Sequence, residues 1–266
     1  MRIFLINSFN NSKYILWARE LSNQIENFGF QTVTVFGGGD GFYCCHLTPL
    51  KSIISITENL SDHNAFVGFE KAFSDGHFRE ESYRNATYIY VHDTCKISTR
   101  NFVETINNLP DVSGWVFAQT YGLYNIGISN QNFLLKRAKD FYGVTHIPKD
   151  KSIALEEGNT VVIGEKQILP LIFYTQKTLA QITNSDLDKC DFVSVSRFGN
   201  TSNKRFVSYI GALSMYKFVG LRASYFVPIW AAACHEIHNE KERSAMVKQF
   251  QNLWIPLVPL PINAGN

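Results

Sequence analysis

Several features that would place the chain in a common class are missing from its 266 residues. The five cysteines include no C-x-x-C pair, so neither a zinc site nor a disulfide framework is expected, and their odd number suits a reducing, intracellular environment. The net charge is only +2, with no dense cluster of Lys and Arg, which argues against a nucleic-acid partner. The apolar stretch 223–234 contains Pro228 and is too short to span a bilayer, so no transmembrane segment is expected.

Glycine is missing from the turn that follows the first expected strand. A dinucleotide-binding fold needs glycines there, because the backbone must approach a pyrophosphate closely. Residues 7–11 read Asn-Ser-Phe-Asn-Asn instead, and the glycines come after the second strand, at 37–41, without the G-x-G-x-x-G spacing. The sequence also contains no G-x-x-x-x-G-K-[ST] motif, so both the NAD-binding and the P-loop classes are disfavoured.

The first half of the chain alternates between strand and helix patterns. Hydrophobic residues make up 45% of the sequence, enough for a sizeable core. Strands are expected at 2–9, 31–36, 52–57 and 86–91. Asn10 to Ser12 and Asp62 are expected to cap the intervening helices, and Gly29 to end the first of them. This alternation predicts an α/β fold with a Rossmann-like, mostly parallel sheet flanked by helices.

The second half of the chain is less regular. Strands are expected at 114–118 and 124–128, followed by a helix that Ser129 caps and Gly143 ends. Beyond residue 145 the pattern predicts strands at 161–163 and 169–174, and only weak helical spacing over 208–218. We therefore expect a regular α/β region at 1–145 and a less regular region with a C-terminal extension at 146–266, within one continuous globular domain.

The most informative segment is the run from Ala86 to Cys95, with the sequence ATYIYVHDTC. Its β-branched and aromatic residues are typical of a strand in the middle of a sheet. Asp93 directly follows this strand and so stands at its carboxyl end, which is where open α/β sheets bind ligands. A plain Asp-Thr turn is the alternative explanation of the same residues.

The order of polar residues after successive strands resembles the nucleotide-sugar domain of GT-A-type glycosyltransferases. In that family a polar residue after strand one and an acid after strand two hold the base and ribose, and a D-x-D motif after a later strand holds a divalent metal. Here Asn7 or Ser8, Asp40 and the run His92-Asp93-Thr94-Cys95 occupy those three places. Asn59 and Asp62 would lie beside the donor pocket, with helix capping as their alternative role. The resemblance thus implies that the donor binds to the region 1–145 and that 146–266 is the acceptor-side region. It implies a donor-binding set comprising Asn7, Ser8, Asp40, Asn59, Asp62, His92 and Asp93.

The motif departs from the family at its last position, where Cys95 replaces the second carboxylate. Mn²⁺ and Mg²⁺ prefer oxygen ligands, so Asp93 would hold the metal with the diphosphate and water. Family members often add a C-terminal ligand, for which His235 is the candidate, with His238 as a second choice. If the metal is dispensable, basic groups such as Lys204 and Arg205 would neutralise the leaving diphosphate instead.

The resemblance implies a transferase that moves a sugar from a nucleoside-diphosphate sugar (a UDP- or GDP-sugar) to a hydroxyl of a glycan, glycolipid or glycoprotein, acting in the cytoplasm. Gln119 and Asn125 would contact donor or acceptor, and Asp191, or one of Glu156, Glu157 and Glu165, would be the base of an inverting enzyme. A retaining enzyme would need no such base. Two alternatives stay open: a non-catalytic or degenerate glycan- or nucleotide-binding module, and a different nucleotide-dependent α/β transferase.

Overall fold

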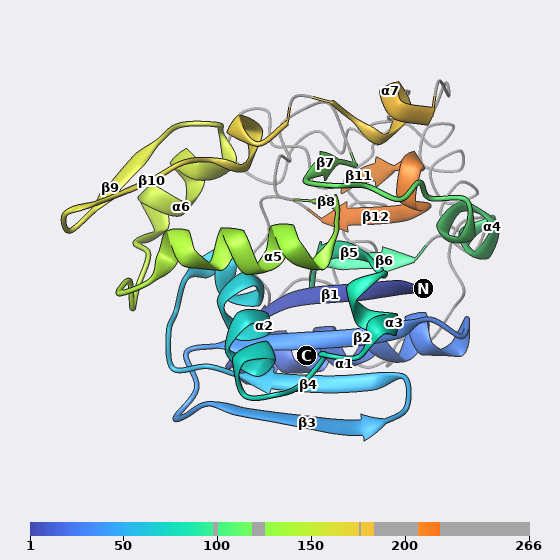
Figure 1. Ribbon diagram of the computed structural model, residues 1–266, viewed down its shortest axis with the longest axis horizontal. Helices are drawn as coiled ribbons and strands as arrows, with labels where there is room; N and C mark the ends of the chain where they lie inside the picture. The colour runs from blue at the N-terminus through green and yellow to red at the C-terminus, as the bar shows by residue number, and fades with distance from the viewer. Residues whose placement is uncertain (98–100, 119–125, 176, 184–206, 219–266) are drawn as a thin grey trace, which may run out of the picture.

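A seven-stranded sheet forms the centre of the protein, with the strand order β3-β4-β2-β1-β5-β8-β7 (Figure 1). The computed structural model describes residues 1–97, 101–118, 126–175, 177–183 and 207–218. The strands of this sheet are β1 (Arg2–Phe9), β2 (Gln31–Gly37), β3 (Tyr43–Thr48), β4 (Lys51–Ser55), β5 (Thr87–His92), β7 (Val116–Phe117) and β8 (Gly127–Ser129).

The four middle strands, β4, β2, β1 and β5, run parallel to one another, whereas β3 and β8 pair antiparallel with the strands beside them. β2 and β5 are buried along their whole length, and β1 except at its two ends. Such burial is expected of parallel strands that are covered on both faces. The predicted α/β fold with a mostly parallel sheet flanked by helices is therefore confirmed.

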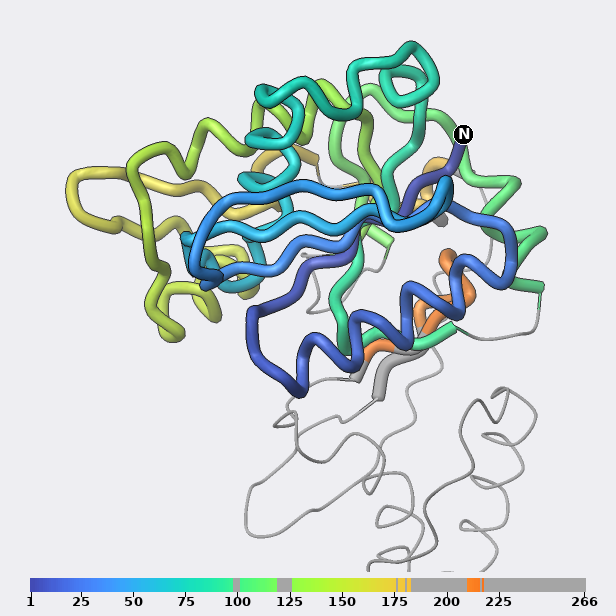
Figure 2. Tube along the Cα trace, turned by 90° about the horizontal axis from the view of Figure 1, so that it is seen from below, coloured from blue at the N-terminus to red at the C-terminus, as the bar shows by residue number. Residues whose placement is uncertain are grey.

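Two layers cover the sheet, one on each face (Figures 1 and 2). Helices α2 (Asn64–Ser74) and α5 (Gln131–Ala138) pack on one face, in a core with Val35, Ile54 and Tyr90. Helices α1 (Ser12–Asn27) and α4 (Phe102–Asn107) pack on the other, in a core with Phe4, Ile6 and Val91. A second sheet lies on the α1 side, with the order β11-β12-β6.

The remaining elements are β6 (Cys95–Ile97), β11 (Val207–Ile210), β12 (Met215–Phe218), β9 (Val161–Ile163), β10 (Lys166–Ile168), α3 (Glu81–Arg84), α6 (Lys149–Glu156), α7 (Leu179–Thr183) and the short 3-10 turns η1 (Ser61–His63), η2 (Lys139–Phe141), η3 (Leu171–Phe173) and η5 (Gly211–Leu213). Among the described residues, none of these helices is long and apolar enough to cross a membrane.

Helix α1 forms where its capping residues predict it. The Asn11 side chain accepts a hydrogen bond from the backbone N–H of Lys13 at 3.1 Å, which satisfies a donor that the first turn cannot pair. Gly29 follows the helix with φ = 82°, a left-handed conformation that glycine adopts without steric cost. The expected start and stop of this helix are confirmed.

Other expected boundaries are wrong. Helix α2 begins at Asn64 with no side-chain cap, so Asp62 does not cap it and lies in η1 instead. Ser129 ends β8, and the neighbouring Asn130 caps α5 by accepting a hydrogen bond from Phe133 N at 2.9 Å. Within the expected strand 169–174, Pro170 lacks an N–H to donate and precedes the turn η3.

The expected helical stretch 208–218 is a hairpin. Strands β11 and β12 pair antiparallel on either side of η5, and Ser214 completes the reversal in a left-handed conformation, with φ = 49°. Strand β3 was not predicted, because it is an edge strand whose residues are exposed or half-buried, and an edge strand needs no continuous apolar run.

Two buried amides fasten the carboxyl end of β1 to the start of α2. Asn64 accepts a hydrogen bond from Leu60 N at 2.6 Å and donates one to Ser8 O at 3.0 Å. Asn7 accepts from Ala65 N at 2.9 Å and donates to Ser61 O at 3.1 Å. These bonds fix the segment that carries Asp62 against the end of β1.

Gly37 leaves room for this arrangement, because a Cβ at that position would lie 2.2 Å from Cγ of Asn64. We predict that Gly37→Ala lowers the free energy of unfolding by about 1–3 kcal/mol through overpacking. Urea unfolding measures the change. Gly41→Ala is the matched control, since its Cβ would meet nothing within 4 Å, and an equal effect of both substitutions would contradict the packing argument.

Candidate functional site

The candidate site lies between β1 and β5, at their carboxyl ends. From β1 the chain crosses on one face of the sheet to β2, and it later returns on the other face to β5, on the opposite side of β1. Open α/β sheets bind ligands at such a switch in strand order. Asp93 directly follows β5 and is only 3% exposed.

Asp93 is held there by the end of β1. The Ser8 hydroxyl donates a hydrogen bond to Oδ2 of Asp93 at 2.8 Å, and the backbone N–H of Asp93 donates to Asn7 O at 3.1 Å. The carboxylate therefore has a fixed position at the carboxyl ends of β1 and β5. The sequence prediction that Ser8 and Asp93 belong to one site agrees with this contact.

The electrostatic environment of Asp93 opposes its ionisation. The pKa of its carboxyl is raised to about 7, mainly by burial and to a smaller extent by the nearby charge of Asp62. The hydrogen bond from Ser8 and the charge of Lys217 act in the opposite direction but do not restore the ordinary pKa. A buried carboxylate in this state is stabilised by any cation that comes close to it.

A second carboxylate reaches the site from another strand end. Asp62, in η1, lies after β4, and its Oδ1 is 3.3 Å from Nδ1 of His92. The Tyr90 hydroxyl donates a hydrogen bond to the backbone oxygen of Asp62. Burial raises the pKa of Tyr14, and the charges of Asp93 and Asp62 raise it to a smaller extent. This tyrosine therefore also faces the two acids. The structure thus gathers Ser8, Asp62, His92 and Asp93, all of which the sequence singled out.

Lys217 supplies a positive charge that the sequence analysis missed. It lies on β12, opposite Cys95 of β6, and its Nζ donates a hydrogen bond to Oγ1 of Thr94 at 2.5 Å. The residue is only 7% exposed. The sequence signal that could have indicated this residue is its place between two aromatic residues, Tyr216 and Phe218. A buried lysine on a strand needs a charged or polar partner.

Cys95 does not take part in the cluster. Its side chain is fully buried in the core on the α1 side, and burial raises the pKa of its thiol. The neighbouring Lys96 forms an ion pair with Glu20 at 2.8 Å. Cys95 therefore serves the core, and Asp62 is the second carboxylate near Asp93.

Other predicted donor residues have different surroundings. Asn7 is 1% exposed and uses both ends of its amide for the backbone of residues 61 and 65, so it positions η1. Asp40 is exposed in the turn after β2, and Asn59 follows β4, where its backbone pairs with residues 145–147. Both stand at the same edge of the sheet as Asp93. Gln119, Asn125, Asp191 and His235 lie outside the described residues.

Comparison with known proteins yields no relative: no family model matches the chain, and no curated protein or solved structure matches it. What the site does must therefore be inferred from its own residues.

Replacing Asp93 by Asn should change how the free energy of unfolding depends on pH. In the unfolded chain the carboxyl ionises near its ordinary pKa of 3.8, whereas in the folded protein it keeps its proton up to about pH 7. Between these values the folded state binds more protons, so the carboxyl lowers stability progressively as the pH rises, by up to about 4 kcal/mol. Asp93→Asn should gain stability relative to wild type over this interval and gain nothing further at higher pH.

Urea unfolding at a series of pH values from about 4 to about 8 measures this difference. Asp150→Asn, at an exposed position on α6, reports the effect of losing a surface charge alone. A constant difference in stability between Asp93→Asn and wild type across the series would contradict the assigned environment.

Proposed function

We propose that the protein is a glycosyltransferase that moves a sugar from a nucleoside-diphosphate sugar to a hydroxyl of a glycan, glycolipid or glycoprotein acceptor. The observation that carries the proposal is the buried Asp93 at the strand-order switch, flanked by Asp62 and Lys217. The order β4-β2-β1-β5 supports it, because doubly wound nucleotide-binding sheets arrange their first four strands in the same way. The choice of a sugar donor rests on the resemblance to GT-A-type glycosyltransferases.

The donor atoms at the site suit a hard divalent cation such as Mn²⁺ or Mg²⁺. Asp93 and Asp62 offer carboxylate oxygens, which such ions prefer, and the raised pKa of Asp93 shows that its negative charge is poorly compensated by the protein alone. These two residues would hold the ion. When bound, it would neutralise charge on the leaving diphosphate.

Lys217 contributes to the same task without an ion. Its ammonium group is fixed beside Thr94, next to Asp93, and it lies on a strand that is paired with β6. A preorganised positive charge stabilises the negative charge that develops on a diphosphate as the bond to the sugar breaks. Lys217 thus takes the part that the sequence analysis considered for Lys204 and Arg205, which lie outside the described residues.

Aromatic side chains flank the end of β1 and suit a base or a sugar ring. Phe9 and Tyr14 pack with ring centroids 5.1 Å apart, and Tyr14 packs in turn on Trp17 at 5.6 Å. Tyr14 also faces the two acids, as its raised pKa indicates. An aromatic face next to a charged cluster matches the needs of a nucleotide, which has a flat base and an anionic diphosphate.

Isothermal titration with UDP and with GDP, each with and without Mn²⁺, tests the proposal. We predict binding of one nucleotide that Mn²⁺ strengthens, and loss of that Mn²⁺ effect in Asp93→Asn. Lys217→Met should weaken binding about 10–100-fold with or without Mn²⁺, since it removes a charged hydrogen-bond donor. Lys149→Met, at an exposed position on α6, is the control and should bind like wild type.

Turnover separates the remaining alternatives. Release of UDP or GDP from a nucleotide sugar, lost in Asp93→Asn, would support the transferase. Nucleotide binding without release from any donor and acceptor tested would favour the non-catalytic module. Binding of neither nucleotide, by a protein that unfolds cooperatively, would contradict the proposed donor site.

A further inference from the structure

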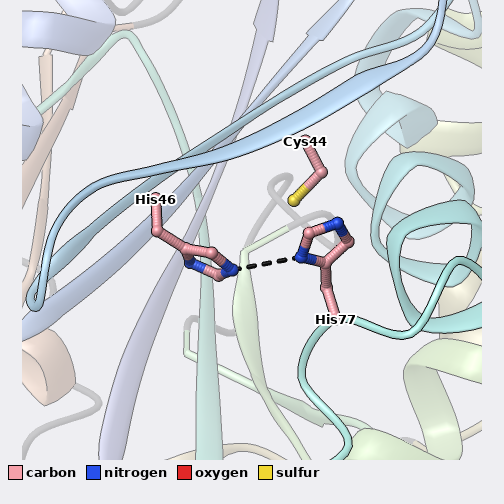
Figure 3. Close-up of side chains that lie close together, drawn as sticks. All are labelled: Cys44, His46 and His77. Atoms are coloured by element: carbon pink, nitrogen blue, oxygen red, sulfur yellow. Dashed lines mark hydrogen bonds between the residues drawn. The ribbon is translucent and has the colours of Figure 1, made fainter.

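Three metal-ligating side chains meet at the edge of the central sheet, away from the candidate donor site (Figure 3). Cys44 and His46 alternate along β3 and so project from the same face of the strand. His77, in the turn that follows α2, points toward them. The three candidate ligand atoms all lie within 4.8 Å of one another, and Nε2 of His46 is 3.1 Å from Nδ1 of His77.

The backbone around His77 is held in an uncommon shape. Gly76 and Phe78, on either side of it, both have left-handed φ values, of 103° and 56°. Phe78 is not a glycine, and its 3% exposed ring is fixed in the core against Phe69 and Tyr83, at centroid distances of 5.3 and 5.2 Å. Strained conformations of this kind persist where packing enforces them, and they are concentrated at functional sites.

Each imidazole also has a second partner on its other ring nitrogen. Nδ1 of His46 lies 2.8 Å from the Ser52 hydroxyl on β4, and Nε2 of His77 lies 3.6 Å from Oδ2 of Asp75. Metal-binding histidines are commonly oriented by a hydroxyl, carbonyl or carboxylate in this way. Nε2 of His46 and Nδ1 of His77 therefore face each other, and both face the thiol of Cys44.

We propose that Cys44, His46 and His77 bind a zinc-class transition-metal ion, with the fourth coordination position open. One thiolate and two imidazoles form a ligand set that suits Zn²⁺ rather than Mg²⁺ or Ca²⁺. A tetrahedral ion with bonds of about 2.0–2.3 Å separates its ligand atoms by roughly 3.3–3.8 Å. Side-chain movements of about 1 Å therefore close the site around the ion.

The ion would act as a clamp. It would join β3, an edge strand, to the turn after α2 on the same face of the sheet. A cysteine binds such an ion as its thiolate, so an entering ion would displace the proton of the Cys44 thiol. The absence of a C-x-x-C pair does not exclude such a site, because its third ligand comes from a turn some thirty residues along the chain.

This metal site is separate from the proposed donor site. Cys44 stands in one row across the sheet with Ile54, Val35, Asn7 and His92. Four strand spacings therefore separate β3 from β5, roughly 19 Å. The zinc site does not depend on the proposed function, and either can fail without the other.

Titration of the metal-free protein with Co²⁺, followed by absorption spectroscopy, tests the proposal. We expect the strong visible bands of a tetrahedral centre and an ultraviolet thiolate-to-cobalt charge-transfer band, both reversed by one equivalent of Zn²⁺. Cys44→Ser should lose the charge-transfer band. Cys45→Ser is the matched control: it removes the neighbouring thiol, which lies on the opposite face of β3, and should keep the full spectrum.

Two further variants complete the test. His77→Gln should lose the tetrahedral visible bands, and Asp75→Asn should weaken Zn²⁺ binding about 10- to 100-fold through its effect on His77. Cooperative thermal unfolding of each metal-free variant establishes that it folds. An absent tetrahedral spectrum in the folded wild type would overturn the proposal, as would a charge-transfer band that survives in Cys44→Ser or disappears in Cys45→Ser.

Discussion

Polar groups that are buried at the carboxyl end of β1 need partners, and this constraint shapes the protein around its candidate site. A buried amide or hydroxyl without a hydrogen bond is costly, and a buried charge more so. The Asn7 amide is hydrogen-bonded to the backbone of residues 61 and 65, and the Asn64 amide to the backbone of residues 60 and 8. The Ser8 hydroxyl is then directed to Asp93, whose carboxyl has a pKa raised to about 7 in spite of this hydrogen bond.

The same constraint explains how distant parts of the chain come together. Asp62 lies at the site because hydrogen bonds hold η1 against the end of β1. Lys217 lies there because β12 pairs with β6, the strand that directly follows the turn at Asp93. Two acids and one buried lysine thus surround a position where a parallel sheet changes strand order. An anionic ligand with an accompanying cation would balance these charges, which is the physical basis for proposing a nucleoside diphosphate.

The sequence predicted the parts of the fold that depend on local patterns. The buried runs of β1, β2 and β5 and the capped helix α1 have strong signals, and the position of Asp93 followed from them. The edge strand β3 and the hairpin of β11 and β12 were not predicted, because their strand conformation depends on pairing and tertiary contacts and not on a local sequence pattern. For that reason Lys217 and the group of Cys44, His46 and His77 could not be placed. Ser8, Asp62, His92 and Asp93, which the sequence singled out, do lie together at one edge of the sheet.

Paramagnetic broadening by Mn²⁺ in the presence of UDP or GDP tests the central claim most directly, because it locates the ion in the folded protein by nuclear magnetic resonance. The account predicts that the backbone amide signals of Ser8, Asp62 and Asp93 broaden first, and that they recover when Mg²⁺ replaces Mn²⁺. The amides of β3, roughly 19 Å away, should broaden much less under the same conditions, because the broadening falls steeply with distance from the ion. Broadening centred elsewhere, or none near Asp93 although the nucleotide is bound, would contradict the account.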